Sequence, residues 1–236
     1  MLVLSSLFCL TSIPAHANDI DYADGLYLAF IKTGNAATDS LSQQGLETVA
    51  SVLNRRTSTE TKGVTGVDPA TDPLVFFPLL YWPMIDGANP LSPEGMVQIQ
   101  NYLDHGGTIL IDTQNRHISS TLLREQLNGL RIPVMQPIAD DHVLKKSFYL
   151  LDDFSGRYRG GDFWVEQDSG NARDGVSSVL IGSNDWASSW VEAGQQRTRQ
   201  NELSVRFGVN VVMYALTGNY KADQVHLPHI LERLGR

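Results

Sequence analysis

The chain has 236 residues and a formal net charge of −8, from 26 acidic and 18 basic side chains. Because the lysines and arginines are scattered along the chain, the sequence argues against a nucleic-acid-binding surface. The only cysteine is Cys9, so residues 18–236 hold no thiol for a disulfide, a cysteine nucleophile or a cysteine-ligated zinc ion. No linker, charge block or repeat divides this length, which predicts one domain over residues 18–236.

Residues 1–17 combine an apolar run, Leu2 to Leu10, with the small-x-small pattern Ala15-His16-Ala17. This combination is typical of a signal peptide that is cleaved after residue 17. A secretory signal normally begins with a positive region, yet no lysine or arginine precedes Lys32. The alternative is therefore that Met1 is not the true start and that the run is a residual membrane anchor. Both interpretations predict a periplasmic domain, either free or anchored to the membrane and facing the periplasm.

The first elements form a strand-then-helix unit. Leu26 to Ile31 is an apolar run of strand length, and the segment from Thr38 to Arg56 repeats apolar residues at helical spacing. Between them, Thr33 and Asn35 flank a glycine at the expected carboxyl end of the strand. We expect a turn there, with these two polar side chains as candidate ligand contacts, although one glycine is a weak phosphate-binding signal. A second apolar run, Leu74 to Tyr81, predicts another strand.

A helix, a Gly-Gly stop and a buried strand follow. Ser92-Pro93-Glu94 has the features of a helix start, namely a capping hydroxyl, a proline in the first turn and an acid near the positive helix end. The next strand, Thr108 to Ile111, ends in Asp112. Because ligands gather at the carboxyl ends of strands in open α/β sheets, Asp112 is a candidate binding or catalytic carboxylate. The alternative is that its carboxylate caps the following turn by accepting backbone amides.

The remaining pattern completes an α/β domain. It predicts a helix after Ser119-Ser120, a buried strand from Ser177 to Ser183, a long helix from Asn201 to Leu216 that stops at Gly218, and a last helix from Pro228 to Leu234. Strands flanked on both sides by helices imply the fold class: α/β, three-layer, with a largely parallel sheet that carries helices on both faces.

A second polar group, Asn184-Asp185-Trp186, follows the strand at Ser177 to Ser183, with Trp190 one helical turn later. A carboxylate beside two indoles could hold a sugar ring, so Asn184, Asp185 and Trp186 are candidate ligand contacts. Tryptophans four residues apart more often pack one face of a helix, which is the interpretation we favour.

Metal and cofactor sites receive little support. Asp140-Asp141-His142 could supply ligands, but it fits equally well as a helix N-cap with acids in the first turn. His226 and His229 are separated by Pro228, and no His-Glu-x-x-His motif is present. Arg157 and Arg159, in a glycine-rich loop, could clamp an anion, although exposed arginines are common in such loops. We therefore predict no metal and no cofactor.

Several longer segments of the sequence are more informative in combination than one by one. They are Leu74 to Pro83, Gly106 to Thr113, His142-Val143-Leu144 with Phe148-Tyr149-Leu150, Ile181 to Trp186, Arg206 to Asn210, and Tyr214 to His226. This combination resembles the bacterial family called domain of unknown function 4159, from about Leu26 to the C-terminus. The resemblance implies a fold similar to the flavodoxin-like, class I glutamine amidotransferase-like group.

The resemblance also implies a setting but no reaction. Members of the family are mostly C-terminal domains of larger membrane proteins whose N-terminal part resembles the Bat aerotolerance proteins. Active amidotransferases carry a cysteine after a strand comparable to Thr108 to Ile111, whereas this chain continues with Asp112-Thr113-Gln114. The amidotransferase chemistry therefore does not transfer to this chain.

We expect a non-catalytic cell-envelope domain that binds a small ligand or a protein partner. The resemblance points to membrane-protein components of a Bat-type assembly, or of an AAA-type ATPase system, as partners. The alternative is an envelope hydrolase that acts on a glycan or an ester, with Asp112 and Asp185 as acid and base. Such a pair works on a glycosidic bond only if the two carboxylates converge across a cleft. The absence of a Gly-x-Ser-x-Gly elbow argues against a standard serine hydrolase.

Overall fold

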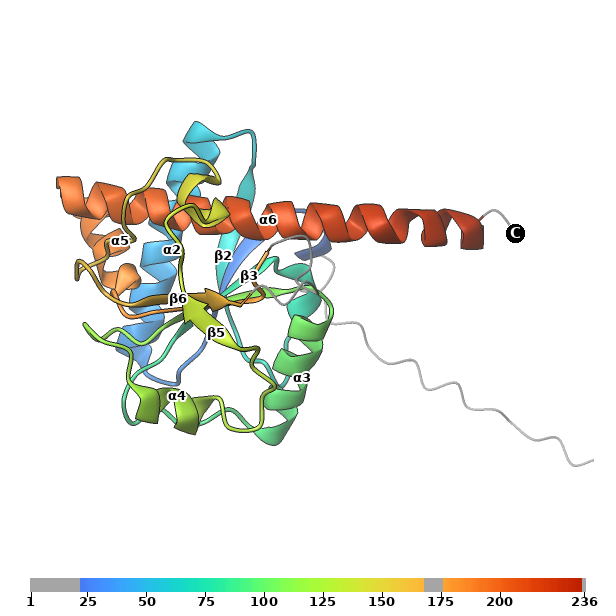
Figure 1. Cartoon of the computed structure of the whole chain (residues 1–236), viewed down its shortest axis with the longest axis horizontal. Helices are drawn as coiled ribbons and strands as arrows, with labels where there is room; N and C mark the ends of the chain where they lie inside the picture. Colours follow the sequence, from blue (N-terminus) through green and yellow to red (C-terminus); the bar gives the residue numbers. More distant parts are fainter. Residues whose placement is uncertain (1–21, 168–175, 235–236) are drawn as a thin grey trace, which may run out of the picture.

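The computed structural model of the chain describes residues 22–167 and 176–234, with side chains as far as residue 217. Its centre is a seven-stranded sheet in the order β2-β1-β3-β4-β7-β6-β5 (Figure 1). The strands are β1 (Leu26–Ile31), β2 (Thr61–Val67), β3 (Leu79–Pro83), β4 (Thr108–Asp112), β5 (Met135–Pro137), β6 (Phe163–Glu166) and β7 (Val179–Gly182).

The neighbouring pairs from β2 to β7 are parallel, and β6 and β5 extend the sheet in antiparallel fashion. Counted along the parallel strands alone, the order is 2-1-3-4-5, which is the order of the flavodoxin-like doubly wound sheet. The predicted fold class is thus confirmed, and the strand order is consistent with a flavodoxin-like fold.

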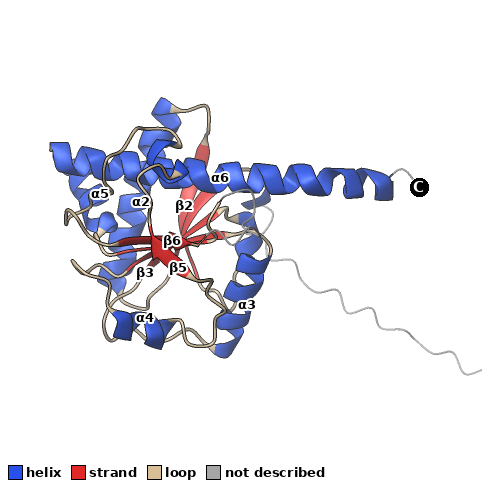
Figure 2. Cartoon of the chain, viewed as in Figure 1, coloured by secondary structure: helices blue, strands red, loops and turns tan. Residues whose placement is uncertain are grey.

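Helices cover both faces of the sheet (Figure 2). One face carries α2 (Ala36–Arg56), α5 (Trp186–Gln195) and α6 (Arg199–Leu234), and the other carries α3 (Pro93–Asp104) and α4 (Ser120–Gln126). Two short 3-10 helices, η1 (Leu74–Phe76) and η2 (Val143–Lys146), lie in the connections.

Strand β1 shows how the sequence separates the two cores. Leu28 and Phe30 pack into the cluster under α2, α5 and α6, whereas Ala29 and Ile31 pack into the cluster under α3 and α4. Side chains alternate between the faces of a strand, so a continuous apolar run is what a strand buried on both faces requires. This is why the run Leu26 to Ile31 identified the strand correctly.

The start of α3 was predicted correctly, whereas α2 begins at Ala36, shortly before the predicted Thr38, and its cap at Asn35 was not predicted. The Ser92 side chain accepts a hydrogen bond from the Gly95 amide at 3.1 Å and caps α3, with Pro93 in the first turn as predicted. Asn35 caps α2 by accepting the amides of Ala37 and Thr38, both at 3.1 Å. In each case a short polar side chain satisfies amides that have no partner within the helix.

Three predicted elements differ from the structure. The run Leu74 to Tyr81 is not one strand: η1 occupies its start, and β3 begins only at Leu79, directly after Pro78. Proline has a fixed φ angle and no backbone N–H to donate. Pro78 therefore separates the 3-10 helix from the strand. Gly218 does not end a helix, because α6 continues through it to Leu234, and no separate last helix begins at Pro228.

The amino-terminal segment predicted as a signal peptide or anchor, residues 1–17, lies outside the described residues. None of the helices in the described part of the chain combines the length and the apolar character that a membrane crossing requires.

Candidate functional site

Asp112 lies at the carboxyl end of β4 and is fully buried. Its Oδ2 atom accepts the Tyr81 hydroxyl and the Trp186 amide, both at 2.8 Å. Its Oδ1 atom accepts the Gln114 amide at 3.0 Å and the Asp185 amide at 3.2 Å. Four donors therefore satisfy the carboxylate. One of them belongs to the turn that follows β4, as the capping interpretation predicted, and two belong to the start of α5.

Burial raises the pKa of Asp112 to about 6, and the nearby charge of Asp185 adds to the rise. The hydrogen bonds from Trp186, Gln114 and Tyr81 favour the charged form and oppose this effect. The Tyr81 phenol has a pKa well above its ordinary value, because it is buried and faces the two carboxylates. Tyr81 thus keeps its proton at neutral pH and donates a hydrogen bond to Asp112.

Two strained backbone positions flank this carboxylate. Gln114 has φ of 54° and Asp185 has φ of 50°, and they are the two non-glycine residues with positive φ in the described chain. Left-handed geometry at such residues costs about 1 kcal/mol or more and persists where the surroundings enforce it. Both residues donate their amides to Asp112, so its carboxylate holds the two turns in place.

A loop, residues 153–161, covers the cluster. The Asn184 side chain donates to the Phe154 carbonyl at 2.5 Å, and the Tyr158 amide donates to the Asn184 carbonyl at 3.1 Å. Gly156 and Gly161 let the loop approach closely: a Cβ at Gly156 would lie 2.3 Å from the Asn184 carbonyl oxygen, and one at Gly161 would lie 1.7 Å from Asn184 Oδ1. The loop therefore packs directly against the turn that follows β7.

Trp186 is enclosed by aromatic rings. Its indole stacks on Phe207 with ring centroids 4.6 Å apart, and its Nε1 donates to the Phe154 carbonyl at 2.9 Å. Trp190, one turn later, is equally buried and donates to the Ser204 carbonyl at 2.9 Å. Both indoles lie in the core, which confirms the packing interpretation. The structure brings Asp112, Asn184, Asp185 and Trp186 together beneath one loop.

Thr33 and Asn35 also lie at the carboxyl ends of the parallel strands, but they follow β1, which is separated from β4 by β3. The Thr33 hydroxyl donates to Asp39 at 2.8 Å, and the Asn35 side chain caps α2. These two side chains support the turn between β1 and α2 and form no part of the cluster around Asp112.

The other candidate groups have structural roles. The Asp140 carboxylate pairs with Lys145 at 2.9 Å, and His142 Nδ1 accepts the Leu144 amide at 3.2 Å, which caps η2. Burial lowers the pKa of His142. Arg157 lies 3.4 Å from the Asp185 carboxylate, so its charge faces an acid of its own chain. The side chains of His226 and His229 lie outside those described.

Tyr81 is the member of the cluster that the sequence did not reveal. It belongs to β3 and pairs with Leu110, two residues before Asp112 on the adjacent strand. A tyrosine in an apolar strand carries no local sign that its hydroxyl meets a carboxylate, because that contact depends on the strand register.

Comparison with known proteins adds one finding. No curated protein sequence matches the chain. The model of the family described as Domain of unknown function (DUF4159) matches residues 27–216, which run from the second residue of β1 through the rest of the sheet and include the cluster around Asp112. The chain therefore belongs to the DUF4159 family.

Proposed function

We propose that this chain is a non-catalytic binding domain of the bacterial cell envelope. The observation that carries the proposal is the state of Asp112, the most prominent polar residue at the strand ends. Its side chain is fully buried, and four donors occupy its two oxygen atoms. A general acid or base must reach the proton that it transfers, directly or through one water molecule. Asp112 instead joins β4 to α5.

The alternative, a hydrolase that uses Asp112 and Asp185, finds little support in this geometry. Only 5 % of Asp185 is exposed, and its carboxylate faces Arg157 under the covering loop. Two catalytic carboxylates must flank a space that admits the substrate. Here a loop of the same chain packs against Asn184 and Asp185, so a substrate that reached Asp185 would first have to displace residues 153–161.

Membership of the DUF4159 family and the apolar N-terminal run support the envelope setting. Within that setting we favour a protein partner over a small ligand, because the strand-end cluster that a small ligand would occupy is filled by the chain itself. Membrane-protein components of a Bat-type assembly, or of an AAA-type ATPase system, are the partners that we propose.

Hydrolytic assays test the non-catalytic part of the proposal. The purified chain would be incubated with p-nitrophenyl acetate, with chitooligosaccharides and with peptidoglycan, beside the variants Asp112→Asn and Asp185→Asn. We expect no turnover that either substitution changes. Turnover that is reproducible in the unaltered chain and is lost in a folded Asp185→Asn variant would establish the hydrolase instead.

An export reporter tests the envelope part. Residues 1–30 would be fused to alkaline phosphatase lacking its own signal, since this enzyme is active only outside the cytoplasm. We expect activity comparable to a fusion with an authentic signal peptide. Activity no higher than that of the leaderless enzyme would contradict the proposed location.

A further inference from the structure

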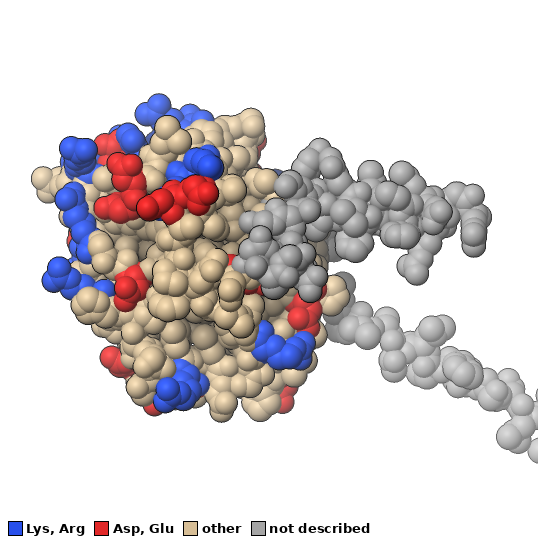
Figure 3. Space-filling model, in the orientation of Figure 1, with Lys and Arg blue, Asp and Glu red and all other residues tan. Residues whose placement is uncertain are grey.

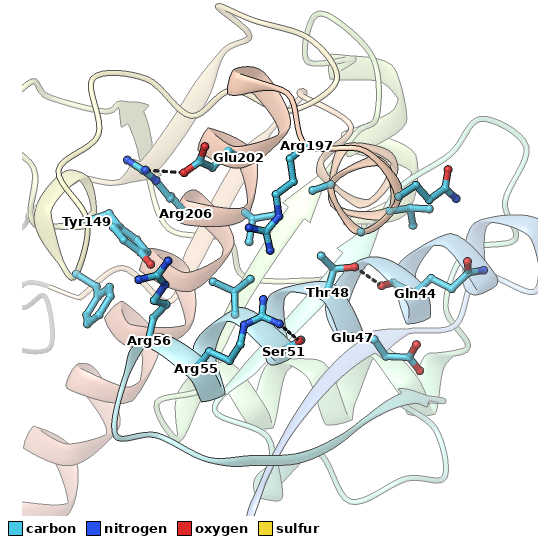
Figure 4. Close-up of a pocket in the computed structure, with 17 residues that line it drawn as sticks. Gln44, Glu47, Thr48, Ser51, Arg55, Arg56, Tyr149, Arg197, Glu202 and Arg206 are labelled. Atoms are coloured by element: carbon cyan, nitrogen blue, oxygen red, sulfur yellow. Dashed lines mark hydrogen bonds and ion pairs between the residues drawn. The ribbon is translucent and has the colours of Figure 1, made fainter.

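A groove on the helical face opposite α3 and α4 has no role in the cluster around Asp112. It has a volume of about 990 Å³ and lies between α2, α5, the start of α6 and the aromatic pair Phe148 and Tyr149 (Figure 4). This volume is at the upper end of the range for small-molecule pockets. The groove is thus large enough for several side chains of a peptide.

Four arginines line the groove, namely Arg55, Arg56, Arg197 and Arg206, against two acids, Glu47 and Glu202. The whole chain carries a net charge of −8, so the positive charge of the groove contrasts with the negative charge of the chain. On the face shown in Figure 3, acidic and basic groups are intermixed, and basic groups gather along the left edge, where α5 and the start of α6 lie.

Two of the arginines are held by their own chain. Arg206 pairs with Glu202 at 2.6 Å and lies over the Tyr149 ring, 5.3 Å from its centroid. Arg55 donates to the Ser51 hydroxyl at 3.0 Å. Such contacts orient the guanidinium groups before a ligand arrives, which lowers the entropy lost on binding.

The other two, Arg56 and Arg197, pair with no carboxylate within residues 22–167 and 176–217. Arg56 is the last residue of α2, and Arg197 lies in the connection between α5 and α6. Their side chains project into the groove from its two sides (Figure 4). A guanidinium group presents donors in a planar fork that matches a carboxylate, so these two groups can bind acids of a partner.

Apolar side chains form the less exposed part of the lining. Val205 and Ala193 are buried, and Val52, Val191 and Arg206 are partly buried, whereas Arg55, Arg56 and Arg197 are exposed. Phe148, which lines the groove, is 40 % exposed, and Leu150, two residues later in the chain, is 85 % exposed. Large apolar side chains that face solvent next to a groove are typical of protein interaction sites. The groove therefore offers an apolar floor and a cationic rim.

We propose that this groove binds a peptide segment of a partner protein that presents apolar side chains to the floor and carboxylates to Arg56 and Arg197. The inference rests on the proposed function as a binding domain and assigns the binding surface and the chemistry of the partner. Glu47 and Glu202 disfavour a uniformly anionic ligand, because like charges repel. In an extended peptide with alternating acidic and apolar residues, the acidic side chains point to one side and the apolar side chains to the other. This arrangement matches the cationic rim and the apolar floor of the groove.

Fluorescence anisotropy provides the test, with a fluorescein-labelled peptide of alternating glutamate and leucine as the probe. A peptide with lysine in place of glutamate is the matched control probe. We expect the acidic peptide alone to bind, with an affinity that falls as salt increases. The double variant Arg56→Gln/Arg197→Gln should weaken binding about tenfold, because it removes two charge-assisted contacts.

The control variant is Arg124→Gln/Arg116→Gln, which removes the same charge from exposed positions outside the groove. It should leave the affinity unchanged. No binding of the acidic peptide, equal weakening by both double variants, or groove-dependent binding of anionic lipid vesicles in place of the peptide would each overturn the inference. Mass spectrometry of the recovered peptide keeps the two proposals apart: cleavage would refute the non-catalytic function, whereas an intact but unbound peptide would refute the groove assignment.

Discussion

The Asp112 carboxylate accepts the Trp186 amide at 2.8 Å and thereby caps α5 from a neighbouring strand. The residue at the N-cap position itself is Asp185, whose own side chain makes no capping bond and whose backbone is left-handed. An N-cap side chain normally accepts amides of the first turn, and here a side chain 74 residues away supplies that acceptor. One buried carboxylate thus fixes the joint between the sheet and α5.

Replacing this carboxylate should strongly destabilise the fold. Asp112→Ala leaves three amides and the Tyr81 hydroxyl without their acceptor in a buried site. We predict a loss of about 3 to 5 kcal/mol in the free energy of unfolding, measured by urea denaturation. The exposed Asp152→Ala should change it by less than about 0.5 kcal/mol. A similar small effect for both variants would show that the cap contributes little.

The raised pKa of Asp112 predicts a pH dependence of stability. The folded chain binds this proton more tightly than the unfolded chain, because the pKa is about 6 in the fold against a normal value of 3.8. The corresponding stability is complete below about pH 4 and is lost as the pH rises through about 6. A shift of about two units corresponds to about 3 kcal/mol.

The measurement compares the unaltered chain with Asp112→Asn, because other groups titrate equally in both. We predict that the stability of the unaltered chain, relative to the variant, falls by about 3 kcal/mol between about pH 3 and about pH 7. A constant difference across this range would mean that Asp112 titrates normally.

Asp185 should influence that titration. Its negative charge raises the pKa of Asp112, so Asp185→Asn should move the pH-dependent loss of stability to lower pH. Asparagine tolerates the left-handed backbone, and the lost pair with Arg157 is long, at 3.4 Å, so the fold should persist. Repeating the pH series on Asp185→Asn, with Asp152→Asn as the control, checks this. An unmoved titration would show that the two carboxylates do not interact.

The close approach of the covering loop makes a steric prediction. A methyl group at Gly156 would lie 2.3 Å from the Asn184 carbonyl oxygen, so Gly156→Ala must displace the loop. We expect a loss of about 2 kcal/mol in unfolding free energy, together with faster cleavage of residues 153–161 by a protease. Arg159→Ala, in the same loop but exposed, should change neither quantity. Equal behaviour of the two variants would contradict the tight packing.

The sequence-based predictions succeeded where the signal depends on residues that are close together in the sequence. The strand at Leu26 to Ile31 and the helix start at Ser92 depend on neighbouring residues and were placed correctly. Strand β2 was missed because its Thr61–Val67 segment contains two glycines and lies at the sheet edge. The short antiparallel strands β5 and β6 also carry too few residues for a clear period.

The candidate site could be predicted even less well than the fold, because it depends on contacts between distant parts of the chain. The sequence indicated Asp112 and Asp185 separately, but their meeting depends on β4 and β7 being neighbours in the sheet. The arginine groove had no signal at all, because Arg56 and Arg197 come from distant parts of the chain. Local patterns find elements and caps, whereas contacts across elements require the topology.

Amide hydrogen exchange of Trp186 tests most directly whether the cluster at the strand ends is a closed structural joint. Its amide is buried and bonded to Asp112, so we predict exchange about a thousandfold or more slower than in an unprotected peptide, and loss of this protection in Asp112→Ala. Rapid exchange at Trp186 in the unaltered chain, with core strands still protected, would show that the loop opens readily and that the cluster is accessible to a substrate.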